Sequence, residues 1–573
     1  MKTYKRITKY SVLLGLMVTM LFNSCETLNL ELQEDPNELG ESSADPNFVL
    51  NSIEGTFGFQ HFGLNAIVEP MMRHNHLFGT YANSAGTETM NAAWQQTYAI
   101  TTNLNFIKPI AEARGLPQHI GVGQVVEAFA YITLVDFIGT AAYSQAVNAE
   151  FPNPKLDEGE DIYNAMYDQL DEAIVNLSQE NAIAFNDIYY NGDASKWIKL
   201  ANSLKLRMYV QSKLVATPAM VASLNAIVAS GNFISDPADD FQVLFGTNET
   251  NPDNRHPYFQ QQYGQGTDAG NVFQSNDFMN LLLNTKSAPD PRTPYYFYRQ
   301  DLNDPPAQDY DHCTPSFLYC YLGDGYDGRD HGDDEGIEND GLQRVAYGIY
   351  PGGGAYDSAG TQAEEIAVAN STFVYDPSAS GTEAEQRALH ISTHLSTVNP
   401  STVNSTNNGG AGVGPFLTAC FVHFLLAEAA LPAPQGMGAS GNSATLLEKA
   451  MQLSFDKVAD VSGIPMPSAD VDDYIDEVMA EFNAADNEGK LEVIAREFYI
   501  ASFGNSIEAY NLYRRTGYPT LEPHVLSSGG AFPRSFFLPA SELNTNANLD
   551  PDLDQKKLTD QVFWDTNPAG FID

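Results

Sequence analysis

The chain has 573 residues, and its 73 acidic and 29 basic side chains give a formal net charge of -44 at pH 7. A nucleic-acid-binding protein needs a basic surface, so this balance excludes polyanion binding as a main role. It suits a protein exposed to water and favours the binding of divalent cations. No long linker rich in Ser, Gly or Pro divides the chain, which predicts one large domain.

Residues 1–24 are predicted to be an export signal. Basic side chains precede an apolar run at residues 11–22, which is too short to cross a bilayer but long enough for the core of a signal peptide. The run is followed by Ser24 and Cys25, and a small residue before a cysteine is typical of lipoprotein processing. We therefore expect cleavage before Cys25 and its acylation, with chains such as palmitate as a membrane anchor. The alternative is a secretory signal with an incidental cysteine.

The rest of the chain is predicted to be a tether followed by one domain. Residues 25–50 are polar and contain two Asp-Pro-Asn turn signals, as expected of a tether. Within the domain at 51–573, apolar residues recur at helical spacing over about 51–231 and 415–520, which predicts a helical scaffold. Residues 232–414 are rich in Gly, Pro, Asp, Asn and Tyr and predict a loop-rich insert. After Cys25, no stretch approaches the ~18 consecutive apolar residues of a membrane helix.

Three helices in the first part of the scaffold have one-sided apolar stripes. We expect Asp193 or Ser195 to cap the third of them. The stripes consist of Val122, Val125, Val126, Phe129 and Ile132, then Tyr163, Met166, Leu170, Ala173 and Leu177, then Trp197, Leu200, Leu204 and Met208.

Several stretches along the chain have the spacing and residue types of one known family. The most specific begins at Tyr189-Tyr190 and runs through Trp197 to Arg207. The full set, in chain order, is 134–146, 189–207, 290–292, 348–354, 424–430, 514–519 and 532–544. Together these stretches resemble the SusD/RagB family of outer-membrane nutrient-binding lipoproteins, in particular its SusD-like branch.

This resemblance implies a mainly α-helical, SusD-like fold, in which tetratricopeptide-like helix pairs support a loop-rich, ligand-facing half. It also implies a lipid-anchored outer-membrane protein, expected at the cell surface, that binds a nutrient oligomer. The ligand would be a glycan, with a peptide as the alternative. The protein would act as a lid on a TonB-dependent barrel of the SusC type.

The alternative function is a surface-anchored hydrolase of glycans or peptides. The sequence contains no nucleophile elbow, no His-Glu-x-x-His motif and no P-loop. Paired carboxylates arise by chance in so acidic a chain. We therefore predict that the protein is not an enzyme, assign no catalytic residue and expect no required cofactor.

Ligand capture would need aromatic faces beside a few hydrogen-bonding groups, because a sugar ring or a peptide side chain packs flat against such a face. Each candidate could equally belong to the core. The candidates are Arg73, His74, His76, Tyr81, Trp94, Tyr258, Phe259 and Tyr263.

An acidic, glycine-rich segment in the insert could hold a structural calcium ion, since hard cations prefer six to eight oxygen ligands. Its spacing is not that of an EF-hand, and a solvated acidic loop is the alternative. The possible ligands are Asp324, Asp327, Asp330, Asp333, Asp334, Glu335 and Asp340. Nearby, Cys313 and Cys320 are close enough in sequence to form a disulfide.

Polar side chains within otherwise apolar helices are expected to be structural. Buried charged groups must be paired or hydrogen-bonded, and such pairs often hold neighbouring helices in register. We therefore predict that Glu428 pairs with an arginine. The same interpretation applies to Asn202, Arg207, Arg514 and Arg515.

Overall fold

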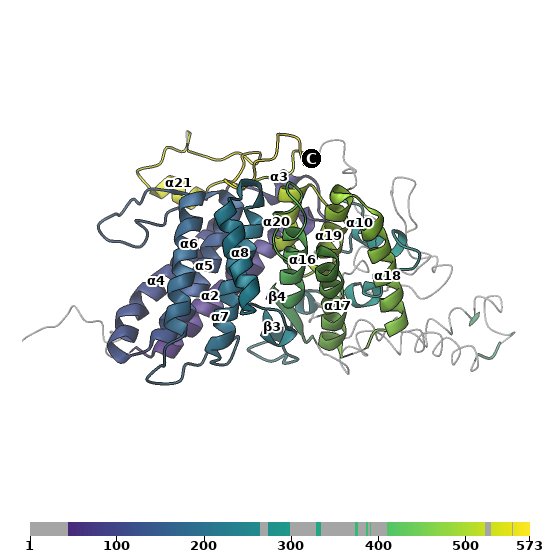
Figure 1. The fold of residues 1–573 in the computed structure, drawn as a ribbon, viewed down its shortest axis with the longest axis horizontal. Helices are drawn as coiled ribbons and strands as arrows, with labels where there is room; N and C mark the ends of the chain where they lie inside the picture. Colours follow the sequence, from purple (N-terminus) through teal and green to yellow (C-terminus); the bar gives the residue numbers. More distant parts are fainter. Residues whose placement is uncertain are drawn as a thin grey trace, which may run out of the picture.

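Helices dominate the protein, as predicted (Figure 1). The computed structural model describes residues 44–263, 273–297, 328–333, 410–463, 465–521, 529–552 and 554–572, with a few single residues between 373 and 390. The predicted signal peptide, the acylation site Cys25 and the Cys313–Cys320 pair lie outside these residues.

Six helices in the first half pack in chain order, each against the next, as antiparallel pairs do in a tetratricopeptide-type stack. They are α2 (Pro46–Met71), α4 (Asn91–Arg114), α5 (Pro117–Ile138), α6 (Gly159–Leu177), α7 (Ala194–Gln211) and α8 (Pro218–Ser230). The three predicted apolar stripes lie on α5, α6 and α7 and are buried. The prediction of a one-sided stripe is wrong for α5, because neighbouring helices cover it on all sides and every residue from His119 to Ile138 is buried. Asp193 caps α7, because its side chain accepts a hydrogen bond from the backbone N–H of Ser195.

The central helix of this group is α5, which is apolar and long enough to cross a membrane by length and composition. In this protein its apolar stretch is completely buried. Two glycines let the flanking helices approach closely. A Cβ atom at Gly121 would lie 2.7 Å from Leu177 Cγ, and one at Gly123 would lie 2.6 Å from Leu104 Cδ1. The helix therefore forms the middle of the core.

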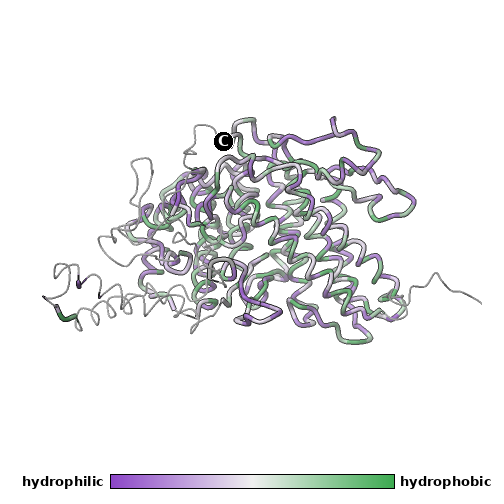
Figure 2. The backbone as a smooth tube through the Cα atoms, turned by 180° about the vertical axis from the view of Figure 1, so that it is seen from behind, coloured by the Kyte–Doolittle hydropathy of each residue, from purple (hydrophilic) through white to green (hydrophobic). Residues whose placement is uncertain are grey.

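A second group of helices continues the stack (Figure 1). It consists of α16 (Ala419–Ala429), α17 (Ser443–Ser462), α18 (Ser468–Ala484), α19 (Asn487–Ala501) and α20 (Ser506–Thr516). The two groups meet where α16 packs on α7 and α20 packs on α2. Along the helices in Figure 2, hydrophobic and hydrophilic residues alternate, as expected when one face of each helix is turned toward the core.

Short elements fill the space between the two groups. The strands β3 (Phe241–Phe245) and β4 (Gly412–Leu417) pair in antiparallel register, with Val243 opposite Gly414. This ladder brings together the two ends of the predicted insert. The other short elements are β1 (Thr140–Ala141), β2 (Asp157–Glu158), α3 (Tyr81–Ser84), α9 (Pro257–Tyr263), α10 (Asn276–Asn284), α11 (Thr293–Tyr296), α21 (Ala540–Thr545), and the 3-10 turns η1 (Lys213–Val215) and η2 (Pro237–Asp239).

The predicted structural role of the polar side chains is confirmed for Arg207, Glu428, Arg514 and Arg515. Asn202 is only partly buried and donates to the backbone carbonyl of Asn232 at 2.8 Å. Glu428 pairs with Arg515 at 2.7 Å, and both side chains are fully buried. Arg207 bonds to Glu508 at 2.6 Å. Arg514 donates to the backbone carbonyl of Arg534 at 2.7 Å. The first two contacts join helices that are far apart in the sequence, and the third holds the segment after α20.

Asp136 at the end of α5 is the centre of the largest of these networks. Its carboxylate accepts hydrogen bonds from Arg207 Nη1 at 3.2 Å, Asn511 Nδ2 at 3.0 Å and Trp564 Nε1 at 3.0 Å. The hydroxyl of Tyr163 donates to it as well. One buried carboxylate thus ties α5, α6, α7, α20 and the C-terminal segment together.

Candidate functional site

The candidate site lies where the turn after α2 meets the start of α10. Arg73, just after the helix, has a φ of 63°, a left-handed conformation that is unfavourable for a side chain with a Cβ. The following residues are held by two isolated β-bridges, Asn75 with Gln274 and Ser275 with Arg329. Strained residues of this kind tend to cluster at functional sites.

A buried ion pair fixes the strained turn to α10. The guanidinium of Arg73 bonds to Asp277 at 2.8 Å. Burial disfavours the charged guanidinium, but Asp277 and Tyr81 outweigh it and raise the pKa of Arg73. The hydroxyl of Tyr81 also lies 3.2 Å from His331 Nε2. The turn after α2, helix α3 and residues 328–333 are thus held at one point.

His74 is buried on the core side of this turn. Its Nδ1 lies 2.6 Å from Ser506 Oγ, its Nε2 lies 3.0 Å from the carbonyl oxygen of Tyr499, and its ring stacks on Tyr499. Burial lowers the pKa of His74 to about 3, so the imidazole is neutral. In this arrangement His74 connects α2 to α19 and α20.

An aromatic surface lies on the outer side of the turn. The Arg329 guanidinium sits between two rings, 5.0 Å from the centroid of Phe78 and 4.6 Å from that of Phe273. His76 packs edge-on against Phe78 and bonds through Nε2 to the carbonyl oxygen of Asp333 at 2.8 Å. Phe78 remains 37% exposed, so this surface combines an accessible ring with a supporting cation.

Sequence reasoning missed three residues of this surface, namely Phe78, Phe273 and Arg329. Phe78 is only two residues beyond His76, but nothing in the local pattern distinguishes it from a core phenylalanine. Two β-bridges, Gln274 with Asn75 and Ser275 with Arg329, bring Phe273 and Arg329 to this surface. Their meeting depends on long-range contacts, which a linear pattern does not reveal.

The other predicted ligand residues are distributed unevenly. Tyr258 joins the cluster because its hydroxyl accepts a hydrogen bond from Asn75 Nδ2 at 3.3 Å. Phe259 is buried in α9, beneath the guanidinium of Arg255. Trp94 is buried elsewhere, in α4, and its indole N–H donates to Glu542 of α21 at 3.3 Å. The side chain of Tyr263 lies outside the described residues.

Two of the possible calcium ligands border this cluster. Asp330 Oδ1 accepts a hydrogen bond from Asn276 Nδ2 at 2.7 Å, and the carbonyl oxygen of Asp333 bonds to His76. Asp324, Asp327, Asp334, Glu335 and Asp340 lie outside the described residues. Among the residues that the structure does describe, no group of three or more His, Cys, Asp or Glu side chains could hold a metal ion. Calcium binding stays a prediction.

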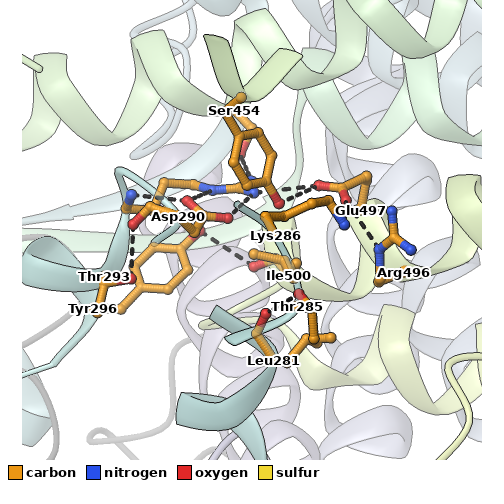
Figure 3. A network of polar contacts seen from close by, with 12 residues as sticks. Leu281, Thr285, Lys286, Asp290, Thr293, Tyr296, Ser454, Arg496, Glu497 and Ile500 are labelled. Atoms are coloured by element: carbon orange, nitrogen blue, oxygen red, sulfur yellow. Dashed lines mark hydrogen bonds and ion pairs between the residues drawn. The ribbon is translucent and has the colours of Figure 1, made fainter. Parts of the chain in front are cut away.

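A second buried network anchors the α10 segment to the helical scaffold (Figure 3). Arg292 makes a two-point ion pair with Asp290, with distances of 2.9 and 2.6 Å. It also donates to Ser454 Oγ of α17 at 3.0 Å. Glu497 of α19 lies within ion-pair distance of Arg292, Arg496 and Lys286, at 3.5, 3.2 and 3.9 Å. The candidate site therefore rests on a rigid support.

Two surface hollows elsewhere in the described part of the chain do not overlap the cluster. One, of about 300 Å³, lies between α4, α5 and α6 and is lined by Lys108, Glu112 and Glu172 among others. The other, of about 550 Å³, lies between α17 and α18. None of their lining residues belongs to the predicted ligand set.

The chain is similar to a known protein family in sequence and to solved structures in fold. Residues 62–314 and 364–539 match the model of a family, SusD-like, described as starch-binding and associating with the outer membrane. The structure is similar to a SusD homologue from Bacteroides uniformis, with a TM-score of 0.63, 19% identity, and coverage of 91% of this chain and 100% of that one. It is also similar to a chitin-binding SusD homologue from Flavobacterium johnsoniae, with a TM-score of 0.59, 18% identity, and coverage of 91% of this chain and 99% of that one. These similarities show the fold. No curated protein matches the sequence.

Proposed function

Because the chain belongs to the SusD-like family described as starch-binding and associating with the outer membrane, we propose that it is a lipid-anchored protein that captures a glycan at the cell surface. It would deliver the glycan to a TonB-dependent barrel of the SusC type by closing over it as a lid. Such a lid needs no chemistry, only different affinities for the ligand in its open and closed states.

The observation that carries the proposal is the exposed ring of Phe78 on its Arg329 support. The apolar C–H face of a sugar ring packs against an aromatic face, while neighbouring polar groups bond to its hydroxyls. The guanidinium of Arg329, held between Phe78 and Phe273, keeps the two rings in place. Phe78 would contact the ligand. The segment around Phe78 would be held in position by Arg73, His76, Tyr81 and Tyr258.

Two of the described carboxylates near Phe78, those of Asp277 and Asp330, favour binding over hydrolysis. A glycosidase needs two carboxyl groups facing the scissile bond, one of them as a proton donor. Here Asp277 is held in a buried ion pair with Arg73, and Asp330 accepts a hydrogen bond from Asn276. Both are committed to holding the segment in place.

The first ligand class to test is the N-acetylated glycans, because one structural neighbour is described as a chitin-binding SusD homologue and another as a chitin-binding protein. The test is retardation of the protein in gels that contain soluble chitin derivatives or starch. Phe78→Ala should abolish the retardation. Phe151→Ala, at another exposed phenylalanine (40% exposed), should leave it unchanged.

The same experiment separates binding from catalysis. Retardation without release of shorter oligomers supports the proposal, whereas release of products by the purified protein supports the hydrolase instead. Both variants should unfold at the temperature of the wild type. Equal retardation of Phe78→Ala and the wild type would show that the aromatic surface is not the site.

The barrel partner is tested separately. The acylated protein, extracted in mild detergent, should co-purify with a large outer-membrane barrel. If it is recovered alone from membranes in which such barrels are abundant, the delivery step is contradicted while glycan capture stands.

A further inference from the structure

The outer face of α2 and α4 is unusual in so acidic a protein because it carries few charges: Asp45 caps α2, and Lys108, Glu112 and Arg114 lie toward the end of α4. On α2 the exposed positions recur at helical spacing, and the only acidic side chains of that helix, Glu54 and Glu69, are buried. The exposed positions are Phe48, Ser52, Phe59, Gly63 and Ala66 on α2, and Ala92, Gln95, Ala99, Thr102 and Asn105 on α4 before Lys108.

Two phenylalanines dominate this face. Phe48 is 76% exposed and Phe59 is 73% exposed. They are eleven residues apart on one helix, which places them on the same side and about 16 Å from each other. Ser52, between them, accepts a hydrogen bond from Asn103 of α4, so the exposed sides of the two helices adjoin. We call these residues the α2–α4 face.

The face begins where the tether enters the body. Asp45 caps α2 directly after the first described residue, Ala44. The guanidinium of Arg114, at the end of α4, bonds to the carbonyl oxygen of Ala44 at 3.0 Å. Residues 26–43 can span at most about 65 Å when extended. The acylated Cys25 of the proposed function would therefore hold Phe48, at the tether end of the body, within about 65 Å of the bilayer.

We propose that the α2–α4 face docks the body onto the lipid bilayer that holds its acyl anchor. This inference rests on the proposed function, since it requires the anchor. Elsewhere the acidic body would be repelled by anionic headgroups, whereas a face with two exposed phenylalanines and few charges can enter the headgroup region. The tether raises the local concentration of this face at the bilayer, so that even a weak contact is populated.

The docking can be tested by tryptophan fluorescence, because the emission of the three tryptophans of the protein should not change when vesicles are added. Trp94, Trp197 and Trp564 are all buried, so Phe59→Trp would introduce an indole at an exposed position. The acylated mature protein is reconstituted into phosphatidylcholine vesicles that contain lipids brominated along their acyl chains. The matched control is Val175→Trp, at a 61% exposed position on α6 beside Asp171 and Glu172.

The expected result is a blue shift and loss of fluorescence for Phe59→Trp on brominated vesicles, with neither change for Val175→Trp. Adding Phe48→Asp to the Phe59→Trp protein should restore the fluorescence. Both tryptophan variants should unfold at the temperature of the wild type, so that a misfolded protein is not taken for a docked one.

Flotation of the vesicles distinguishes this inference from the proposed function. Protein that floats with the vesicles while Phe59→Trp stays unquenched overturns docking and leaves the anchor intact. Protein that does not float overturns the anchor and docking together. A blue shift that needs a co-purified barrel, or that grows with protein concentration without vesicles, assigns the face to a protein interface and also overturns the proposal.

Discussion

Arg515 and Glu428 face each other as a fully buried two-point ion pair, with Nε to Oε1 at 2.9 Å and Nη2 to Oε2 at 2.7 Å. The pair joins α20 to α16, which are 87 positions apart in the chain. Lys213 lies 2.9 Å from the same carboxylate. Burial opposes ionisation of Glu428, but Arg515 and Lys213 outweigh it and lower its pKa to about 2.

Removing this carboxylate should be costly. Glu428→Ala leaves Arg515 and Lys213 as buried cations without their shared partner, and breaking a buried pair in this way typically costs about 3–5 kcal/mol. The free energy of unfolding in urea measures the loss. Glu448→Ala, at an exposed position on α17, is the control and should change stability by less than about 0.5 kcal/mol. Similar effects of the two substitutions would contradict the structural role.

The buried carboxyl of Glu69 should make the protein less stable as the pH rises. Burial raises its pKa from 4.5 to about 8. A raised pKa means that the contribution of Glu69 to stability is fully present below pH 4.5 and is lost as the pH rises toward 8. The free energy of unfolding of Glu69→Gln, relative to that of the wild type, should therefore rise by up to about 1.4 kcal/mol per pH unit in this range.

The measurement is urea unfolding of both proteins at intervals between pH 5 and pH 8. The exposed substitution Glu448→Gln serves as the control and should follow the wild type at every pH. A constant difference between Glu69→Gln and the wild type across the range would show that the Glu69 carboxyl is ionised in the folded protein.

The anchor around Arg292 should control the order of the α10 segment. Arg292→Ala leaves Asp290 and Glu497 buried with fewer partners, and it removes the contact with Ser454. We expect faster hydrogen exchange in residues 276–297, with little change in α5. Arg496→Ala, which loses the more exposed Glu481 but leaves Glu497 with Arg292 and Lys286, should have a smaller effect. Uniform exchange throughout the protein would indicate global unfolding instead.

Asp136 should be the most sensitive position of the core. Asp136→Ala removes the acceptor shared by Arg207, Asn511 and Trp564, so we expect a loss of at least about 3 kcal/mol. Hydrogen exchange in residues 554–572 should rise first, because Trp564 holds that segment. Asp168→Asn, on the exposed side of α6, is the control. Unchanged protection of the C-terminal segment would contradict the central role of Asp136.

Helix positions and caps could be predicted from local patterns. The apolar stripe from Tyr163 to Leu177 forms the buried face of α6, and Asp193 caps α7. Local rules succeed here because a stripe and a cap depend on residues three or four positions apart. The need for a partner at Glu428 could be predicted for a similar reason, since a carboxylate among apolar neighbours must be paired wherever it lies.

The partners themselves were decided only by the tertiary structure. Arg515 rather than another arginine faces Glu428, and Arg329 lies between Phe78 and Phe273, because the chain path brings distant segments together. The small number of charges around Phe48 and Phe59 likewise depends on the observed burial of Glu54 and Glu69. Composition and periodicity determine which residues must be covered or paired, whereas only packing determines what covers them.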